Sequence, residues 1–273
     1  MTLLGVCGWP VGHSRSPRMH AAALRAVGLG DWRYLALPLP PDVFAETVAA
    51  LPAAGFRGVN VTIPHKEAAL ALADEASPAA REIGASNTLV FDDGRIVAEN
   101  TDAPGLLAAL GPGRSPAGRR ALVLGAGGSA RAVVWALRRA GAAQVLVWNR
   151  TPGRAEALAR DMDGEVQVRA VTDVAPGQVP EIVVNCTSVG LAGEAEPFKG
   201  LPLRADDVGA GSLVVDLVYA DGGTRLLEAA STRGADVVDG LEILVAQGAA
   251  SFERWTGRAA PRQAMREAAE TIA

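Results

Sequence analysis

The stretch that decides the fold runs from residue 121 to residue 151. Residues 121–131 read ALVLGAGGSAR, and residues 145–151 read VLVWNRT. The first segment is an apolar run that leads into a glycine-rich turn, and the apolar residues after the turn recur at helical spacing. The second segment is a short apolar run typical of a buried strand. Together they predict a strand–helix–strand unit, in which glycines let backbone amides approach a pyrophosphate at the helix N-terminus.

The end of the second strand indicates which dinucleotide this unit binds. Proteins that bind NAD usually place Asp or Glu about 20 residues past the turn, to hold the ribose 2′-hydroxyl. Here residues 149–151 are Asn-Arg-Thr, Arg154 follows, and the first carboxylate is Glu156. Because arginine can pair bidentately with phosphate, this set suits a 2′-phosphate and favours NADP(H) over NAD(H). The alternative is that Arg150 and Arg154 are solvated residues at the start of a helix.

Composition narrows the class of protein. A length of 273 residues suggests two domains, and a hydrophobic fraction of 49% allows a sizeable core. The net charge of −4 and the scattered Lys and Arg residues do not indicate a basic surface for nucleic-acid binding. We expect no membrane span, because no apolar stretch is long enough, and no metal site, because the three histidines fit no zinc signature. Cys7 and Cys186, far apart in predicted strands, indicate reduced thiols and a cytoplasmic protein.

Residues ahead of the glycine-rich unit alternate between short apolar runs and helical patterns. This alternation predicts a largely parallel sheet with helices on its faces. Asp93-Gly94, between extended runs at 86–92 and 95–99, is typical of a hairpin turn. A connecting helix at 103–110 and a linker rich in Gly and Pro at 111–116 follow. The other strands expected here are 3–8, 32–37 and 58–63, and the helices are 21–27, 41–51 and one that begins at Pro64.

Residues after the linker are expected to form the dinucleotide-binding domain, which begins near Arg119. Helices at 241–255 and 262–272 end the chain, and we expect them to return and pack on the first domain. The later strands of the second domain are predicted at 166–170, 182–185, 213–216 and 235–238.

Polar side chains interrupt the strand predicted at residues 58–63. Residues 58–66, which include this strand and the start of the next helix, read GVNVTIPHK. A parallel strand covered on both faces should be apolar throughout. Residues 59, 61 and 63 satisfy that expectation, whereas Asn60 and Thr62 break it near the end where open parallel sheets bind ligands. Since a buried polar group is costly unless it is hydrogen-bonded, one interpretation is a polar ligand. The other is that both side chains bond to neighbouring backbone.

Lys66 is predicted in the first turn of the helix that follows this strand. The helix macrodipole is positive at that end and disfavours a cation. Lys66 is therefore more plausible as an acid/base group than as a surface charge. His65, next to it, is interpreted as a surface residue at the helix start.

Four other polar residues lie at the starts of predicted helices or strands. Asp102 could orient Lys66 or a substrate hydroxyl, or could cap the helix that begins at residue 103. Asn87 is a polar group at a strand start, and Ser14 and Ser16 could be N-caps of the first helix.

A series of short stretches, taken together, resembles the shikimate dehydrogenase family. Each stretch is moderately specific, the set is very specific, and the stretches follow the family's order over nearly the whole chain. They are residues 13–17 (HSRSP), 60–66 (NVTIPHK), 84–88 (GASNT), 100–102 (NTD), 125–131, 149–151, 185–190 (NCTSVG), 216–219 (DLVY) and 239–242 (DGLE).

The resemblance implies an α/β protein of two domains with the site in a cleft between them. A substrate-binding and catalytic domain with a mainly parallel sheet would comprise residues 1–102 and 240–273, and a Rossmann NADP-binding domain would comprise residues 103–239. It also implies the NADP-dependent interconversion of 3-dehydroshikimate and shikimate, a step in the biosynthesis of chorismate and aromatic amino acids. Within the family, Arg15 departs from the pattern, since an apolar residue usually separates the two serines.

The resemblance also assigns roles to individual residues. Lys66 would be the acid/base and Asp102 its partner. The substrate ligands would be Ser14, Ser16, Asn60, Thr62, Asn87, Asp102, Tyr219 and Gln247. The cofactor ligands would be Gly125, Ala126, Gly127, Gly128 and Ser129 for the pyrophosphate, and Asn149, Arg150, Thr151 and Arg154 for the adenosine phosphate. Leu217 and Gly240 would lie near the nicotinamide, and Thr187 and Ser188 would line the cofactor.

Two alternative functions and one question of assembly stay open at this point. One alternative is a quinate/shikimate dehydrogenase of broader specificity, which would need room for an extra hydroxyl. The other is a non-catalytic NADP-sensing protein, against which the presence of Lys66 and Asp102 argues. Small molecules are the expected partners, and a homodimer formed through a long edge strand of the first domain is left open.

Overall fold

The computed structural model describes residues 1–162, 164–175, 178–191 and 196–271. The chain forms two compact units, Met1–Gly105 with Leu244–Ala273 (unit 1) and Leu106–Ile243 (unit 2). It passes from one unit to the other within helix α5 (Asp102–Leu110) and within helix α9 (Gly240–Thr256). The boundaries expected from sequence, after residue 102 and before residue 240, fall a few residues earlier, at the starts of these two helices.

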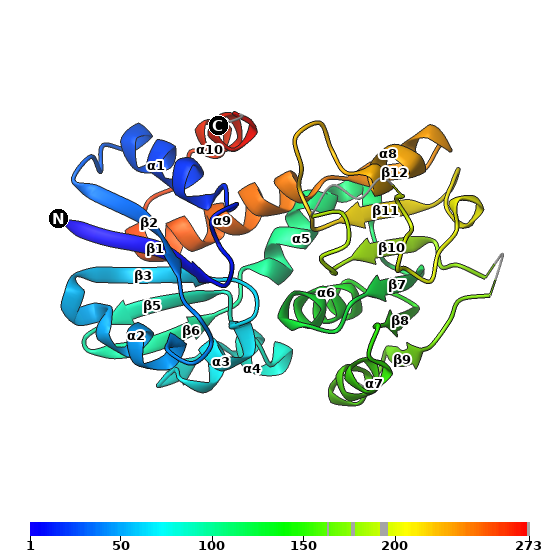
Figure 1. The fold of residues 1–273 in the computed structure, drawn as a ribbon, viewed down its shortest axis with the longest axis horizontal. Helices are drawn as coiled ribbons and strands as arrows, with labels where there is room; N and C mark the ends of the chain where they lie inside the picture. Colours follow the sequence, from blue (N-terminus) through cyan, green and yellow to red (C-terminus); the bar gives the residue numbers. More distant parts are fainter. Residues whose placement is uncertain (163, 176–177, 192–195, 272–273) are drawn as a thin grey trace. The chain divides into compact units, whose positions relative to one another are not determined.

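Unit 1 contains a mixed six-stranded sheet in the order β2-β1-β3-β5-β6-β4 (Figure 1). The pairs β1–β2 and β1–β3 are parallel, and β5 runs antiparallel to β3 and β6. The Asp-Gly hairpin turn is confirmed between β5 and β6, because Asp93 (φ 46°) and Gly94 (φ 76°) both adopt positive φ. The strands are β1 (Thr2–Gly8), β2 (Trp32–Pro38), β3 (Phe56–Val61), β4 (Glu75–Ala76), β5 (Thr88–Asp92) and β6 (Arg95–Glu99).

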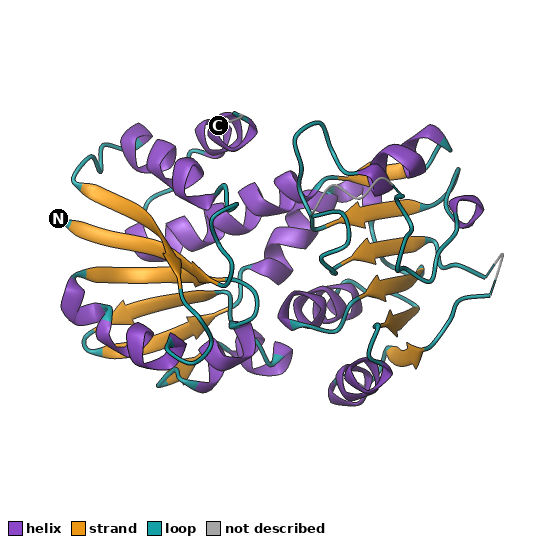
Figure 2. Ribbon diagram, viewed as in Figure 1, coloured by secondary structure: helices purple, strands orange, loops and turns teal. Residues whose placement is uncertain are grey.

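Helices flank this sheet, and the C-terminal helices belong to unit 1 (Figure 2). Helix α10 packs against α1, so the end of the chain lies with the first helix in unit 1. The apolar core includes the fully buried side chains of Phe44, Val59 and Leu89. The helices are α1 (Ser16–Ala26), α2 (Phe44–Ala50), α3 (Lys66–Ala71), α4 (Pro78–Ile83), α9 and α10 (Arg262–Glu270), with a short 3₁₀ turn η1 (Pro52–Ala54).

Strand β3 corrects one expectation from sequence. It ends at Val61 rather than at residue 63, so Thr62 and Ile63 lie in the turn that precedes α3. Ile63 is 60% exposed and does not continue the apolar face of the strand. The Thr62 amide still donates to Cys7 O, and Ile63 O accepts from the Trp9 amide just past β1, but the His65 amide closes a turn onto Thr62 O and ends the extended segment.

Unit 2 contains a fully parallel sheet in the order β12-β11-β10-β7-β8-β9. Read from β9, the strands follow the order 3-2-1-4-5-6 of a doubly wound dinucleotide-binding fold, with the change of direction between β7 and β10. The strands are β7 (Arg120–Leu124), β8 (Gln144–Trp148), β9 (Gln167–Val171), β10 (Ile182–Asn185), β11 (Leu213–Asp216) and β12 (Asp236–Val238). The helices are α6 (Gly128–Arg139), α7 (Pro152–Asp161) and α8 (Arg225–Thr232). Two 3₁₀ turns are η2 (Pro112–Arg114) and η3 (Ala205–Asp207).

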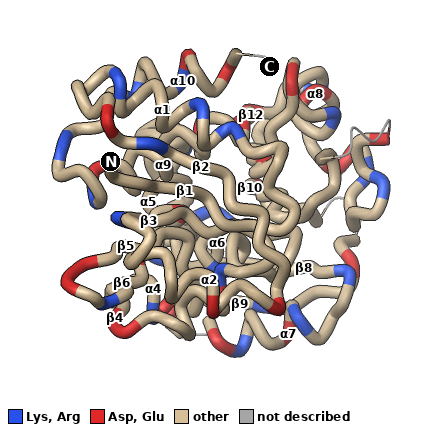
Figure 3. The backbone as a smooth tube through the Cα atoms, turned by 60° about the vertical axis from the view of Figure 1, so that its left-hand side comes forward, with Lys and Arg blue, Asp and Glu red and all other residues tan. Residues whose placement is uncertain are grey.

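Charged residues of both signs are interspersed along the chain of each unit (Figure 3). None of the helices in the described part of the chain has the length and apolar character that a membrane span requires. Among the same residues, no cluster of three or more His, Cys, Asp or Glu side chains could hold a metal ion.

Candidate active site

Lys66 and Asp102 form an ion pair in unit 1. Lys66 begins α3, Asp102 begins α5, and the Lys66 Nζ lies 2.5 Å from the Asp102 Oδ2. Only 11% of the lysine side chain and 15% of the aspartate side chain are exposed. A carboxylate at a helix start is favoured by the macrodipole, whereas an ammonium there is not, so the lysine depends on Asp102 for compensation. The pair therefore places an amine that can give or take a proton at a nearly enclosed position.

The carboxylate of Asp102 does not cap its own helix. That role belongs to Asn100, whose Oδ1 accepts a hydrogen bond from the Ala103 amide at 3.2 Å. The second carboxylate oxygen of Asp102 accepts instead from Asn87 Nδ2 at 2.9 Å. Of the two interpretations of Asp102 that the sequence left open, the geometry corresponds to the one in which it orients Lys66.

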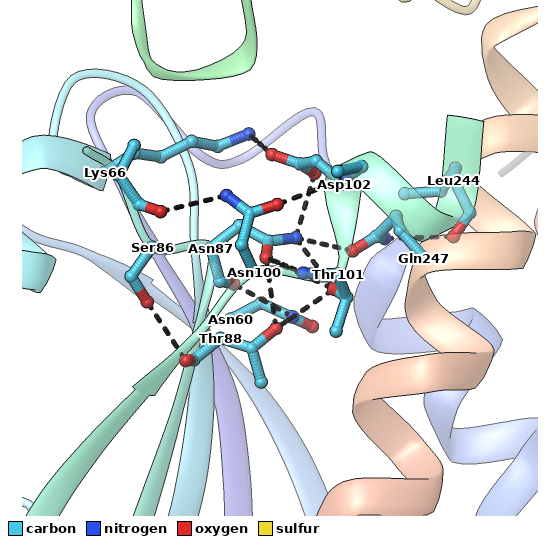
Figure 4. A network of polar contacts seen from close by, with 12 residues as sticks. Asn60, Lys66, Ser86, Asn87, Thr88, Asn100, Thr101, Asp102, Leu244 and Gln247 are labelled. Carbon is cyan, nitrogen blue, oxygen red and sulfur yellow. Dashed lines mark hydrogen bonds and ion pairs between the residues drawn. The ribbon is translucent and has the colours of Figure 1, made fainter. Parts of the chain in front are cut away.

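Asn87 joins the ion pair to a buried polar network, which Figure 4 shows. Its Nδ2 lies within hydrogen-bonding distance of Thr101 Oγ1 (2.9 Å) and Gln247 Oε1 (3.2 Å), and its Oδ1 accepts from the Thr101 amide at 2.6 Å. Asn87 and Thr101 are each less than 5% exposed. Because a buried polar network is stable only when its members are satisfied, these bonds fix the orientation of the Asn87 amide.

Gln247 reaches this network because α5 and α9 approach closely at Gly105. A Cβ atom on Gly105 would lie 2.7–2.9 Å from the Gln247 backbone nitrogen, Cα and Cβ, so only glycine fits there. The Gln247 Nε2 donates to Leu244 O at 2.9 Å, which leaves its Oε1 towards Asn87.

His65 is not the surface residue that the sequence suggested. It is 2% exposed, its ring stacks on Phe44 with centroids 4.1 Å apart, and its Nε2 lies 2.7 Å from Leu39 O. Together with the bond from the Ser86 amide to Lys66 O at 2.8 Å, this packing anchors the start of α3. His65 therefore holds the backbone that carries the lysine.

The two serines and Thr62 have local contacts. Ser14 Oγ accepts from the Ser16 amide at 3.2 Å at the start of α1, and neither serine caps that helix, whose N-cap is Arg15. The Arg15 guanidinium donates to Ala269 O, near the end of α10. Thr62 faces Gly8, where a Cβ atom would lie 2.4 Å from the threonine methyl group.

Unit 2 has a cradle for an anion between β7 and α6. Gly125 adopts φ 110°, and a Cβ atom there would lie 3.1 Å from Cys186 O, so both the backbone angle and the space require glycine. The N-cap of α6 is Gly127, and no side chain caps the helix. The first amides of this 12-residue helix, which lack an intrahelical partner, are the kind of donor that binds a pyrophosphate.

The residues after β8 supply two cations and one hydroxyl beside a second helix start. Arg150, Thr151 and Arg154 are exposed, and Thr151 is the N-cap of α7. Asn149 Nδ2 donates to Thr151 O at 2.9 Å, which fixes the turn that displays them. This donor set, with no carboxylate among residues 149–154, fits the 2′-phosphate of NADP.

A buried aspartate organises the ends of β10 and β11. Asp216 accepts hydrogen bonds from Asn185 Nδ2 (2.9 Å), Thr224 Oγ1 (2.7 Å) and the Val218 amide (3.1 Å). Burial raises the pKa of Asp216 to about 6, although these hydrogen bonds oppose the rise. A Cβ atom on Gly240 would lie 2.6–2.8 Å from the carbonyl oxygens of residues 216–218. The network therefore gathers the segments around Thr187, Leu217 and Gly240 at the strand ends where such sheets bind the cofactor.

Comparison with known proteins assigns the chain to a family. Family models match along it, described as the shikimate dehydrogenase substrate binding domain (residues 6–89), shikimate / quinate 5-dehydrogenase (111–190) and the shikimate 5'-dehydrogenase C-terminal domain (240–270). The shikimate dehydrogenase (NADP(+)) of Citrifermentans bemidjiense is 44% identical over 97% of this chain and 93% of its own length. The shikimate dehydrogenase (NADP(+)) of Acidiphilium cryptum is 48% identical over 93% of this chain and 90% of its own length.

The chain belongs to the shikimate dehydrogenase family. Among solved structures, the shikimate 5-dehydrogenase of Thermus thermophilus in complex with NADP(H) and shikimate matches with a TM-score of 0.87. It is 45% identical, and the match covers 98% of both chains. The resemblance inferred from short motifs is thereby confirmed, as is the α/β fold class.

The residues that the family resemblance singled out are divided between the two units. Lys66, Asn60, Asn87, Asp102 and Gln247 share one hydrogen-bonded network in unit 1. Ser14, Ser16 and Thr62 belong to the same unit, whereas the expected cofactor ligands and Tyr219 belong to unit 2.

Some residues of the network could not be singled out from sequence. Tyr34, Thr88, Thr101 and Ser251 carry hydroxyls that join it, from β2, β5, the α5 entry and α9. One signal was present for Ser251, since Gln247 and Ser251 are one turn apart and both polar in an otherwise apolar stretch of helix.

A second overlooked signal concerns Lys66. Of 26 basic residues, only Lys66 and Lys199 are lysines, and the rest are arginines. An arginine cannot be deprotonated in proteins, whereas an amine can. A chain that otherwise uses arginine keeps a lysine at the enclosed position where proton transfer would need one.

Proposed function

We propose that this protein is an NADP-dependent shikimate dehydrogenase that interconverts 3-dehydroshikimate and shikimate. The observation that carries the proposal is the enclosed Lys66–Asp102 pair, held by Asn87 in a chain of this family. The activity for which the relatives are named supports the substrate and the cofactor.

In the reduction, Lys66 acts as the general acid. The bound cofactor supplies the hydride that reduces the ring ketone. The Lys66 ammonium gives a proton to the oxygen of that ketone as negative charge develops on it, and Asp102 compensates the charge of the ammonium beforehand. In the oxidation, the Lys66–Asp102 pair takes the hydroxyl proton. Such acid–base assistance is typically worth about 10²–10⁴ in rate.

The other polar residues of unit 1 bind the substrate in this proposal. Asn87, Asp102, Gln247 and Thr62 hold ring hydroxyls, and Ser14 and Ser16 hold the carboxylate. Tyr219 of unit 2 is assigned to the substrate from the resemblance. Asn60 was included in the same set, and its geometry is considered below.

The cofactor residues follow from the anion cradle of unit 2. Residues 125–129 hold the pyrophosphate through backbone amides, and Asn149, Arg150, Thr151 and Arg154 hold the adenosine phosphate. Leu217 and Gly240 lie near the nicotinamide, and Thr187 and Ser188 line the cofactor.

A second candidate is a dehydrogenase that also accepts quinate. The family model that matches residues 111–190 covers both shikimate and quinate enzymes. Quinate carries one more hydroxyl, so it would need additional room beside Ser14, Ser16 and Thr62. Parallel measurement of kcat/KM with shikimate and with quinate distinguishes the two.

The direct test is reduction of NADP⁺ by shikimate, followed by the absorbance of the reduced cofactor. We expect turnover with NADP⁺ and weaker turnover with NAD⁺ at equal concentration. No turnover by folded protein with either cofactor would refute the proposed function.

We also propose a cytoplasmic location and leave assembly to measurement. Cys7 is fully buried in β1, and burial raises the pKa of its thiol to about 12, which suits a protein with reduced thiols. A homodimer would need an exposed edge, and β2 is an edge strand of seven residues with Leu35 40% exposed. Sedimentation equilibrium would report whether two copies associate.

A further inference from the structure

Asn60 is directed into the protein and not towards solvent. It lies on β3, is 5% exposed, and its Oδ1 accepts a hydrogen bond of 2.7 Å from the Tyr34 hydroxyl. Its Nδ2 lies 3.2 Å from Asn87 O, 3.1 Å from Thr88 Oγ1 and 2.9 Å from Ser251 Oγ. Both polar atoms of the amide therefore have buried protein partners.

The backbone carbonyl of Asn87 fixes which way the Asn60 side-chain amide faces. If the amide were flipped, its oxygen would face the Asn87 carbonyl oxygen, and two acceptors would meet. In the observed orientation the amide donates to Asn87 and accepts from Tyr34. Tyr34 thus completes the only arrangement in which the Asn60 side chain satisfies both neighbours.

The Tyr34 ring is held independently of its hydroxyl. It stacks on the His20 ring with centroids 4.3 Å apart and planes 5° apart, and it lies 6.2 Å from the Trp255 ring. Removing the hydroxyl alone therefore leaves the ring packed in place.

Asn60 contacts two of three hydroxyls that bond to one another. The oxygens of Thr88, Thr101 and Ser251 lie 2.8–3.1 Å from one another. Thr101 accepts from Asn87 Nδ2, and the same NH₂ group lies 2.9 Å from Asp102 Oδ1. In Figure 4 Lys66 and Asp102 lie at the top of the network and Asn60 in its lower half, with Asn87 between them.

We propose that Tyr34 and Asn60 are positioning residues for the Lys66–Asp102 pair, and that Asn60 is not a substrate ligand. Asn60 holds the Asn87 carbonyl and the hydroxyls of Thr88 and Ser251. Asn87, so held, aims its NH₂ group at Asp102. The inference rests on the proposed function and deepens it, because it makes the rate of proton transfer depend on Tyr34, a side chain of the edge strand β2.

A positioning role and a substrate contact predict different kinetics. Loss of a substrate ligand raises KM for shikimate, whereas loss of a positioning group lowers kcat with KM little changed. Tyr34 makes the distinction sharper, because it is 6% exposed and its hydroxyl is occupied by Asn60. In this proposal its hydroxyl affects kcat through the bond to Asn60.

The experiment compares Tyr34→Phe, Asn60→Ala and the double variant with the wild-type enzyme in shikimate-dependent reduction of NADP⁺. We expect Tyr34→Phe to lower kcat by about 3- to 10-fold, the effect of one lost buried hydrogen bond, with KM for shikimate within about twofold. In the Asn60→Ala background, Tyr34→Phe should lower kcat no further, because its partner is already absent.

Thr256→Val is the matched control. The Thr256 hydroxyl donates to Phe252 O at 2.8 Å on α9, so its loss also removes a hydroxyl hydrogen bond of unit 1. We expect kcat to stay at the wild-type value, while thermal unfolding reports the effect on the fold for each variant. This separates misplacement of the catalytic pair from general loss of stability.

The outcomes are distinguishable. A wild-type enzyme without shikimate-dependent turnover overturns the proposed function and this inference with it. An active wild-type enzyme whose Tyr34→Phe variant keeps its kcat, or loses affinity for shikimate without losing kcat, overturns the inference alone. Equal kcat losses in Tyr34→Phe and Thr256→Val do so as well. Should Asn60→Ala fail to fold, Tyr34→Phe against Thr256→Val decides the question by itself.

Discussion

His20 makes the stability of the protein depend on pH in the mildly acidic range. The residue lies on α1 and is 0% exposed, and neither ring nitrogen has a hydrogen-bond partner among the described residues. Its neighbours are the rings of Tyr34, Phe252 and Trp255, none of which is charged at neutral pH. Burial in this apolar surrounding lowers the pKa of His20 from 6.5 to about 3.

The direction of the effect follows from that pKa. Between pH 6.5 and pH 3 the unfolded chain binds a proton at His20 that the folded protein does not. The contribution of neutral His20 to stability is therefore complete above pH 6.5 and is lost progressively as the pH falls. Each pH unit costs about 1.4 kcal/mol, so at pH 4.5 the loss is about 3 kcal/mol. That is a large share of the roughly 5–15 kcal/mol that stabilises a typical protein.

The variant that tests this is His20→Phe, which keeps an aromatic ring stacked on Tyr34 but removes the titration. The free energy of unfolding, measured in urea from pH 7.5 to pH 4.5, should fall by about 3 kcal/mol more in the wild type than in the variant. His13→Gln, which removes an exposed histidine, controls for the loss of an imidazole and should follow the wild type. Parallel curves for wild type and His20→Phe would refute the reasoning.

Two further predictions concern the cofactor and the core. Arg150→Ala should raise KM for NADP⁺ by roughly 10-fold and leave KM for NAD⁺ little changed, since only NADP⁺ carries the phosphate that a guanidinium binds; equal changes with both cofactors would count against a phosphate contact. Gly58→Ala should destabilise unit 1 by about 2 kcal/mol or more, because its Cβ would lie 2.2 Å from Trp255 Nε1 and 2.4 Å from Leu89 O, whose hydrogen bond to each other it would break. Thermal unfolding measures this effect, and an unchanged midpoint would show that the strand can shift to make room.

The glycine-rich turn and the strand alternation made most of the fold predictable from sequence. Local periodicity and turn chemistry are enough to identify a parallel nucleotide-binding sheet, and the Asp93-Gly94 hairpin likewise depends only on adjacent residues. Element ends were less predictable. Strand β3 stops at Val61, although an apolar residue follows at position 63, because the His65 amide closes a turn onto Thr62 O there.

Residues of the polar network could be singled out from sequence where a residue type conflicted with its position, and not elsewhere. Lys66 at a helix start and Asn60 in a buried strand are such conflicts. Tyr34 and Thr88 are ordinary strand residues, and only the pairing of distant strands brings their hydroxyls to Asn60. His65 was misjudged for the same reason, because its burial depends on Phe44 and Leu39 from elsewhere in the chain.

The measurement that tests the central claim most directly is the turnover of Lys66→Ala with shikimate and NADP⁺. Lys199→Ala is a natural control, because it removes the other lysine of the chain, which is exposed. We predict that kcat of Lys66→Ala falls by at least about 100-fold with a smaller change in KM, whereas Lys199→Ala matches the wild type. A well-folded Lys66→Ala enzyme with near-wild-type kcat would contradict the role of the lysine in proton transfer.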